Sequence, residues 1–122
     1  MSYHPINLAV RFLLELAALA ALGYWGRQQG SGLTGYALMI VLPLIAAILW
    51  GIFNVPGDPS RSGKAPVAVP GIVRLGLELL FFTAAVIALY HAGAIRSSQV
   101  LGTVVAIHYL VSYNRILWLL ER

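Results

Sequence analysis

Four long runs of apolar residues, separated by shorter polar or proline-rich stretches, make up most of the chain. The runs cover residues 6–25, 33–53, 71–90 and 99–119. Each is close to the ~20 mostly apolar residues that a helix needs to cross the hydrocarbon core of a bilayer. The pattern therefore predicts an all-α integral membrane protein, a bundle of four transmembrane helices in a single domain over residues 1–122.

Proline and aromatic residues mark the ends of these runs. Pro5 suits the first turn of a helix, and Tyr24 and Trp25 are typical of the point where a span leaves the bilayer. Pro43 falls inside the second run and predicts a kink there. The stretch 54–70 holds four prolines, which indicates a stiff and largely non-helical loop. Short turns are expected at 26–32 and 91–98.

The composition supports the membrane class and excludes several others. Hydrophobic residues are 60% and charged residues 10% of the 122 positions, against ~25% charged in a typical soluble domain. No large soluble domain fits outside four spans. Cysteine is absent, which excludes disulfides and thiolate chemistry. No cleaved signal peptide is expected, because Arg11 and Glu15 interrupt the first apolar run.

The net charge of +4 is better explained by topology than by nucleic acid, since no basic patch is interleaved with aromatic residues. Two cations, Arg27 and Arg96, flank the short turns. Six lie towards the side that holds both termini and the long loop: Arg11, Arg61, Lys64, Arg74, Arg115 and Arg122. By the positive-inside rule, both termini and the loop are predicted to be cytoplasmic.

A pair of opposite charges occurs twice inside the apolar runs. Arg11 and Glu15 in the first run match Arg74 and Glu78 in the third, at an offset of 63 residues. Each half holds two spans, so two repeats would share one orientation in the membrane. A parallel repeat is one interpretation of this match, and chance spacing is the other.

The depth of these charges makes them candidates for a function. Glu15 lies ten residues after Pro5, about 15 Å into a core about 30 Å thick. The order Arg then Glu is the poorer one for a pair within one helix. We therefore expect Arg11 to bridge to Glu78 and Arg74 to Glu15. Such a ring either fixes the register of the helices or lines a polar site for a proton, ion or small solute.

The last run carries a second polar group of residues. His108, Ser112 and Arg115 share one helix face, and Tyr109 lies on the adjacent one. This face could meet the Arg and Glu ring at the centre of the bundle. Alternatively, Arg115 belongs to an interfacial belt and His108 is a packing residue with a hydrogen bond.

The loop and the histidines indicate no cofactor or metal. The segment 57–65 is not a phosphate-binding loop, because five residues separate Gly57 from Gly63 where the motif has four. Arg61 and Lys64 are predicted to meet anionic lipid headgroups, with packing of the loop beneath the bundle as the competing view. His4, His91 and His108 are too scattered to predict a metal site.

Three segments together resemble the YrdB-like family of small bacterial membrane proteins. They are HPINLAVRFLLELAAL (4–19), FNVPGDPSRSGKAPVAVPG (53–71) and HYLVSYNRILWLL (108–120), and the loop is the most specific of them. The resemblance implies a four-helix protein of the bacterial inner membrane. The family has no established activity, so it implies no catalytic residues. It does imply that the loop is more than a spacer.

Two functional hypotheses follow. The first is a non-enzymatic protein that binds or conducts a small solute or ion through the polar residues named above. The second is a structural or partner-binding protein whose charges only specify helix assembly. An enzyme is not expected, since no activated nucleophile or recognisable motif is present. The expected partners are the bilayer and a second copy of the chain, brought close by the small residues Ala17, Ala18, Ala20 and Ala21.

Overall fold

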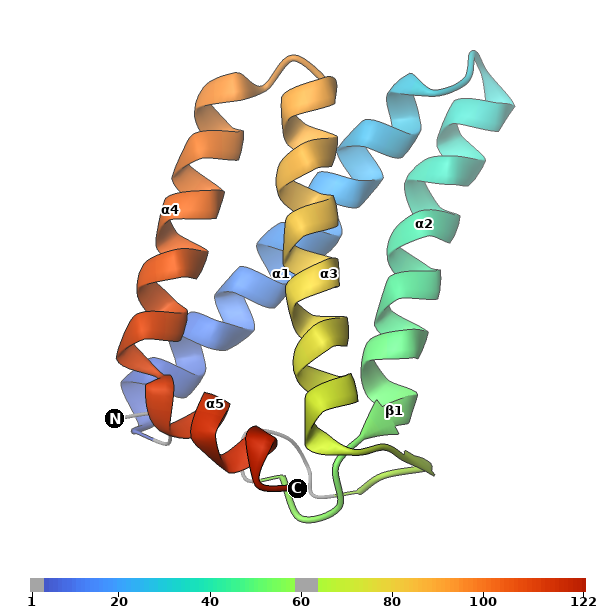
Figure 1. The fold of residues 1–122 in the computed structure, drawn as a ribbon. Coiled ribbons are helices and arrows are strands. Elements are labelled where there is room, and N and C mark those ends of the chain that lie inside the picture. The colour runs from blue at the N-terminus through green and yellow to red at the C-terminus, as the bar shows by residue number, and fades with distance from the viewer. Residues whose placement is uncertain (1–3, 59–63) are drawn as a thin grey trace.

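The computed structural model describes residues 4–58 and 64–122 and folds them into helices joined by short connections (Figure 1). The helices are α1 (Pro5–Gln28), α2 (Leu33–Ile52), α3 (Gly71–His91), α4 (Ile95–Val111) and α5 (Tyr113–Leu120). Two short strands, β1 (Phe53–Asn54) and β2 (Val67–Ala68), lie between α2 and α3. The predicted all-α class is therefore confirmed.

The number of possible spans differs from the expectation in its fourth member. Within the described ranges, α1, α2 and α3 are each long and apolar enough to cross a membrane. Helices α4 and α5 meet that standard only as a pair, and the pair is bent by 68°. A continuous helix over 99–119 is thus wrong, because the helix begins at Ile95 and breaks at Ser112.

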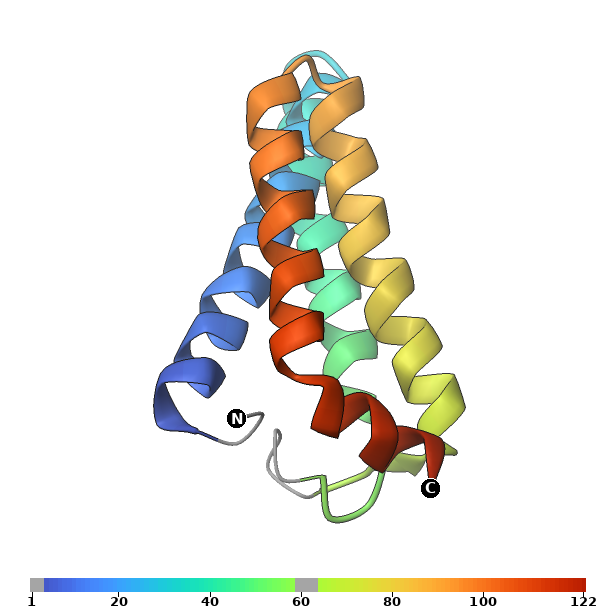
Figure 2. The same cartoon turned by 60° about the vertical axis from the view of Figure 1, so that its left-hand side comes forward.

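Tertiary contacts explain the break. The Ser112 hydroxyl accepts a hydrogen bond of 2.7 Å from the Asn7 side chain of α1. Beyond Ser112, α5 turns under the bundle (Figure 2) and carries Arg115 to two buried carboxylates. Gly71 allows this turn, because a Cβ at that position would overlap the carbonyl of Leu119. An apolar helical pattern alone does not record such contacts.

Helix α3 is the central element of the bundle. It contacts α1, α4 and α5, whereas α2 packs mainly on α1. Helices α1 and α3 run in the same direction, and α1 passes obliquely behind α3 in Figure 1. The start of α1, the end of α5 and the connection between α2 and α3 all lie at one end of the molecule. That end holds the polar residues.

The described part of the connection between α2 and α3 has little regular structure, but hydrogen bonds hold it in place. Strands β1 and β2 pair in parallel, with Phe53 opposite Val67 and Asn54 opposite Ala68. A turn at Val55 to Asp58 follows, closed by the Asp58 N–H on the Val55 carbonyl at 3.2 Å. Gly57 has a φ of +76°, a conformation that favours glycine. This turn aims Asp58 back towards the bundle.

The close packing of α1 on α2 involves the expected proline. Pro43 lies inside α2 and cannot donate a hydrogen bond to the Met39 carbonyl one turn earlier. That carbonyl faces Gly23 of α1, where a Cβ would lie 3.0 Å from the oxygen. A small residue at this position therefore lets the two helices approach at the level of the proline.

The interior and the surface of the bundle are both apolar. Trp50, Phe81, Phe82 and Tyr109 form an aromatic group, with ring centroids 4.7 Å apart for Trp50 and Phe81. Large apolar side chains also point outward on every long helix, for example Ile40, Leu44, Leu80 and Leu110. Such a surface suits hydrocarbon better than water.

Candidate functional site

Glu78 of α3 is the centre of the polar cluster and is fully buried. Arg74 Nε donates to Oε2 at 2.9 Å, and the Tyr109 hydroxyl donates to Oε1 at 2.9 Å. Arg115 Nη2 also donates to Oε2. Arg11 Nη2 lies 2.8 Å from Oε1. One carboxylate therefore joins α1, α3, α4 and α5.

Arg115 links this carboxylate to the connection between α2 and α3. Its two terminal nitrogens donate to the two oxygens of Asp58, at 2.6 and 2.9 Å. Such a bidentate arrangement is among the strongest hydrogen-bonded ion pairs that side chains make. Both residues are buried. The Asp58 turn is thus fastened beneath the bundle through α5.

Arg74 fastens the end of α2 to α3. Its Nη1 donates to the carbonyls of Trp50 and Phe53 at 2.8 and 2.9 Å. The last carbonyls of a helix lack partners within the helix, and a cation is favoured there. The Arg74 guanidinium also lies over the Trp50 ring, 4.3 Å from its centroid. Arg74 therefore serves as a helix cap as well as an ion-pair partner.

The cluster is balanced in charge. Its cations are Arg11, Arg74 and Arg115, and its anions are Glu15, Asp58 and Glu78. A buried charge without a partner is costly, and each of these has an opposite charge within 4 Å. The set can therefore be buried without a bound ion to neutralise it.

The symmetric ring expected from the repeat is only partly correct. The Arg11 to Glu78 bridge is confirmed at 2.8 Å. Arg74, however, binds Glu78 of its own helix, and Arg11 also lies 3.5 Å from Glu15 of its own helix. The prediction that Arg74 pairs across helices with Glu15 is therefore wrong. Arg115 and Asp58 break the twofold pattern, because they draw Glu78 into a larger network.

Arg11 differs from the other two arginines. It is only 3% exposed, and it lies 5.6 Å from the Trp50 ring and 5.9 Å from the Tyr109 ring. Its ion-pair distances are short, but Nε, Nη1 and Nη2 have no hydrogen-bond partner in the described part of the chain. Arg11 is therefore paired with these carboxylates in charge but not in hydrogen-bond geometry.

His108 of α4 is the neighbour of Arg11 across the interface of α1 and α4. One turn below them, Asn7 bonds to Ser112 at 2.7 Å, and Arg11 and His108 each lie four residues from that pair. His108 is 4% exposed, and neither ring nitrogen has a partner among residues 4–58 and 64–122. Two buried polar groups thus face the same interface with unused hydrogen-bonding capacity.

The structure brings the sequence candidates together at one end of the bundle. Arg11, Arg74, Glu78, His108, Tyr109, Ser112 and Arg115 are buried there, and Glu15 is partly exposed. Arg115 is buried, whereas Tyr113, two residues earlier in the chain, is exposed. The interpretation of Arg115 as part of an interfacial belt is therefore wrong, while Tyr113 is placed at the surface.

Three contributors were not singled out from the sequence: Asp58, Asn7 and Trp50. A signal for Asp58 was present, because the chain has only four acidic residues for its eight cations. Arginines inside apolar runs need anions, so every acid was a candidate partner. The roles of Asn7 and Trp50 depend on how the helices cross, and no spacing within one run indicates them.

The other predictions concern the loop cations, the metal ligands and the small residues of α1. Lys64 is exposed, and Arg61 lies outside the described residues. Across the part of the chain that the structure describes, no three His, Asp or Glu side chains gather as metal ligands would. The small residues divide, with Ala18 and Ala21 inside the bundle and Ala17 and Ala20 on its surface.

Comparison with known proteins gives the family. A family model described as a protein of unknown function (DUF2568) matches residues 9–106. The chain belongs to the DUF2568 family. The uncharacterized protein YrdB of Bacillus subtilis (strain 168) is a relative, 45% identical over 116 residues, which cover 95% of this chain and 94% of YrdB. No solved structure matches.

The DUF2568 match spans Arg11, Glu15, Arg74 and Glu78 and ends shortly before His108. The resemblance inferred from the three segments is therefore confirmed. No activity is known for the DUF2568 family or for YrdB by these descriptions. Function has to be argued from the geometry of the site.

Proposed function

We propose that this protein is a non-enzymatic membrane protein that binds a small hydrogen-bond acceptor, such as a carboxylate, between α1 and α4. Arg11 and His108 are the binding residues. Arg74, Glu78, Arg115 and Asp58 form the rigid support that holds Arg11 in place. Helices α1, α2 and α3 and the bent pair of α4 and α5 are proposed to lie in the bilayer of the bacterial inner membrane.

The observation that carries this proposal is the unused hydrogen-bonding capacity of Arg11 and His108. A buried donor without a partner costs about 1–3 kcal/mol, and buried polar groups with no partner are rare enough to need an explanation. Arg11 offers N–H donors and His108 offers one donor and one acceptor. A ligand with two acceptor oxygens would satisfy both side chains at once.

Binding fits the cluster better than conduction or catalysis. Glu78 accepts hydrogen bonds from Arg74, Arg115 and Tyr109 and pairs with Arg11. A carboxylate held in this way is poorly placed to pass an ion along. It is equally poorly placed to act as a base with His108, which is the pairing that an intramembrane enzyme would need.

A second candidate, helix assembly alone, is favoured by the same saturation of Glu78. In that case the network fixes the register of the helices, and water molecules satisfy Arg11 and His108. The two candidates differ in one measurable respect: a binding site exchanges its occupant with a small acceptor added from solution, and a purely structural site does not.

The experiment is nitrogen NMR of the purified protein with labelled histidine side chains, titrated with acetate. The chain has three histidines, so the variant His108→Phe assigns the signals of His108, and His4 and His91 are internal controls. We expect a saturable change at His108 alone. If the protein is folded and the His108 signals do not change up to high acetate concentration, the binding proposal is wrong. Helix assembly would then be the remaining candidate function.

The proposed topology has its own test. Both termini and the connection between α2 and α3 are proposed to be cytoplasmic, with Arg61 and Lys64 near anionic headgroups. Since the chain has no cysteine, single variants Gln28→Cys and Glu121→Cys can be labelled without background. Position 28 should react with a membrane-impermeant reagent from outside, and position 121 should not. The reverse pattern would overturn the orientation.

A further inference from the structure

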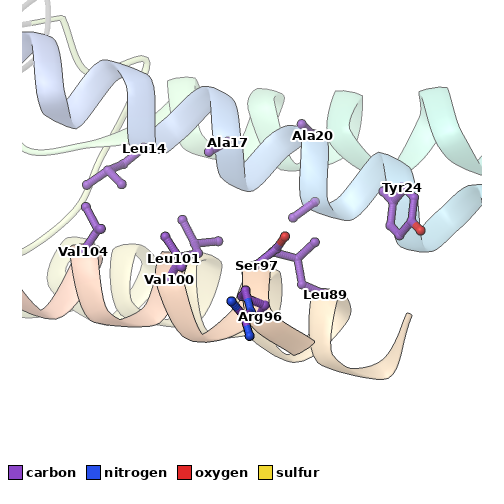
Figure 3. Close-up of a pocket in the computed structure, with 11 residues that line it drawn as sticks. Leu14, Ala17, Ala20, Tyr24, Leu89, Arg96, Ser97, Val100, Leu101 and Val104 are labelled. Atoms are coloured by element: carbon purple, nitrogen blue, oxygen red, sulfur yellow. The ribbon is translucent and has the colours of Figure 1, made fainter. Parts of the chain in front are cut away.

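An apolar groove lies between α1 and α4. It has a volume of about 560 Å³ and is lined by α1 from Leu14 to Tyr24, by α4 from Arg96 to Val104 and by Leu89 of α3. Figure 3 shows Leu14 and Val104 facing each other at one end of it, with Tyr24 and Arg96 towards the other end. Ala17 and Ala20 form its wall without filling it, and both are exposed.

The register of the two helices connects this groove to the polar site. Asn7 faces Ser112, and the antiparallel course of α4 brings the next turns into contact in order. Arg11 stands one turn before Leu14, and His108 stands one turn after Val104. The inner end of the groove therefore lies one turn from the two side chains whose nitrogens have no hydrogen-bond partner among the described residues.

The dimensions and charges favour one kind of occupant. From Leu14 to Tyr24 the groove follows ten residues of α1, ~15 Å at the rise of an α-helix. That is about half of a hydrocarbon core ~30 Å thick, the depth of one leaflet. The groove wall is almost wholly apolar, whereas the turn beyond its inner end carries Arg11, a buried cation that is paired with Glu78. An apolar chain with an anionic head matches both ends.

We propose that the site between α1 and α4 binds a single-chain carboxylic amphiphile, with its carboxylate on Arg11 and His108 and its chain in the groove. This inference rests on the proposed function and names its ligand class. The head lies towards the end of the bundle that holds both termini, and the tail points towards Arg96. A ligand that fills the groove supplies apolar burial that acetate lacks, and it therefore binds more tightly.

The test uses Trp50 as a reporter of where each end of the ligand lies. The variant Trp25→Phe, Trp118→Phe leaves Trp50 as the single tryptophan, and its ring is 5.6 Å from the Arg11 guanidinium. The protein in phosphatidylcholine nanodiscs is titrated with dodecanoate that carries bromine beside the carboxylate or at the far end of the chain. Bromine quenches tryptophan only at close range. We expect saturable quenching that is several-fold stronger for bromine beside the carboxylate.

Two sets of variants in that background separate the head from the tail. Ala17→Phe and Ala20→Phe fill the groove and should abolish the saturable quenching, while acetate still moves the His108 NMR signals. Ala37→Phe, an equal change at an exposed position of α2, is the matched control and should change nothing. His108→Phe removes half of the head site without disturbing the ion pairs of Glu78, and it should weaken dodecanoate at least tenfold.

The outcomes distinguish the failure of each proposal. If the groove variants leave quenching by dodecanoate unchanged, or if bromine at the far end quenches as strongly as bromine beside the carboxylate, the groove is not the tail site and this inference is wrong. Acetate binding at His108 would still support the proposed function in that case. If neither acetate nor dodecanoate affects His108, both proposals are wrong.

Discussion

Arg115 and Arg11 both pair with the carboxylate of Glu78 but bind it differently. Arg115 donates a bidentate pair of hydrogen bonds to Asp58 and a further hydrogen bond to Glu78. Arg11 also lies close to Glu78, yet its N–H groups meet no hydrogen-bond geometry with it. The part of the cluster around Arg115 and Asp58, here the closed side, has both its charges and its hydrogen bonds satisfied. The part around Arg11 and His108, the open side, is neutral in charge, but its nitrogens have no hydrogen-bond partner among the described residues.

This difference shows how a buried charged cluster can combine support with binding. An ion pair that also satisfies its hydrogen bonds fixes geometry, because any movement loses several contacts at once. An ion pair that satisfies only the charge keeps an arginine buried at tolerable cost while leaving its donors for a partner. The comparison predicts severe effects from changes on the closed side and mild effects on the open side.

The largest effect is expected from Glu78→Gln. It removes the anion that Arg11, Arg74 and Arg115 share, and breaking a buried pair by removing one partner costs about 3–5 kcal/mol. The free energy of unfolding, measured by denaturant titration in mixed micelles, should fall by that amount or the protein should fail to fold. Glu15→Gln, at the partly exposed acid, should cost clearly less. Equal losses would contradict the central position of Glu78.

Next in size is the bidentate pair on the closed side. Asp58→Asn and Arg115→Met should each cost about 2–5 kcal/mol, because each removes one charge of a buried, hydrogen-bonded ion pair. The double variant should cost less than the sum of the two, since it removes both charges together. Additive losses in this cycle would show that Asp58 and Arg115 act separately, and the connection between α2 and α3 would not be fastened through α5.

A smaller effect is expected where α5 packs on the start of α3. Gly71→Ala places a methyl group against the Leu119 carbonyl, and overpacking of this kind costs about 1–3 kcal/mol. Gly76→Ala in the same helix meets no atom within 4 Å and should be neutral or more stable by up to about 1 kcal/mol. A Gly71→Ala protein as stable as Gly76→Ala would show that α5 does not pack there.

The smallest effect on stability belongs to the open side. His108→Phe replaces a ring whose nitrogens have no partner with an apolar ring of similar size, so the unfolding free energy should stay within about 1 kcal/mol of the parent. The same variant should lose acetate binding. A loss of stability as large as that of Arg115→Met would mean that His108 has a structural role on the closed side, and the comparison would fail.

Much of this arrangement was predictable from the apolar runs and the charges inside them. The three long helices follow directly from run length, because backbone groups in an apolar stretch are best satisfied within a helix. The Arg11 to Glu78 bridge followed from placing two parallel helices with charges at similar depth. Arg74 and Glu78 also came from the sequence as members of one cluster, although not with their pairing.

The parts that could not be predicted depend on contacts between distant segments. The break at Ser112 contains neither proline nor glycine, and it exists because Asn7 and the carboxylates hold α5 at an angle. Asp58 enters the cluster because the turn at Gly57 redirects the chain. The open side of Arg11 depends on side-chain orientation, which spacing along a helix does not determine.

The order of the cluster's members along the chain has a consequence for biosynthesis. Chains are made from the N-terminus, at about 5–20 residues per second, so Arg11, Asp58, Arg74 and Glu78 all reach the membrane before Arg115. Until that residue arrives, the ion pair between Asp58 and Arg115 cannot form. We therefore expect the Asp58 turn to be more accessible to protease in chains truncated before residue 115 than in the released full-length chain.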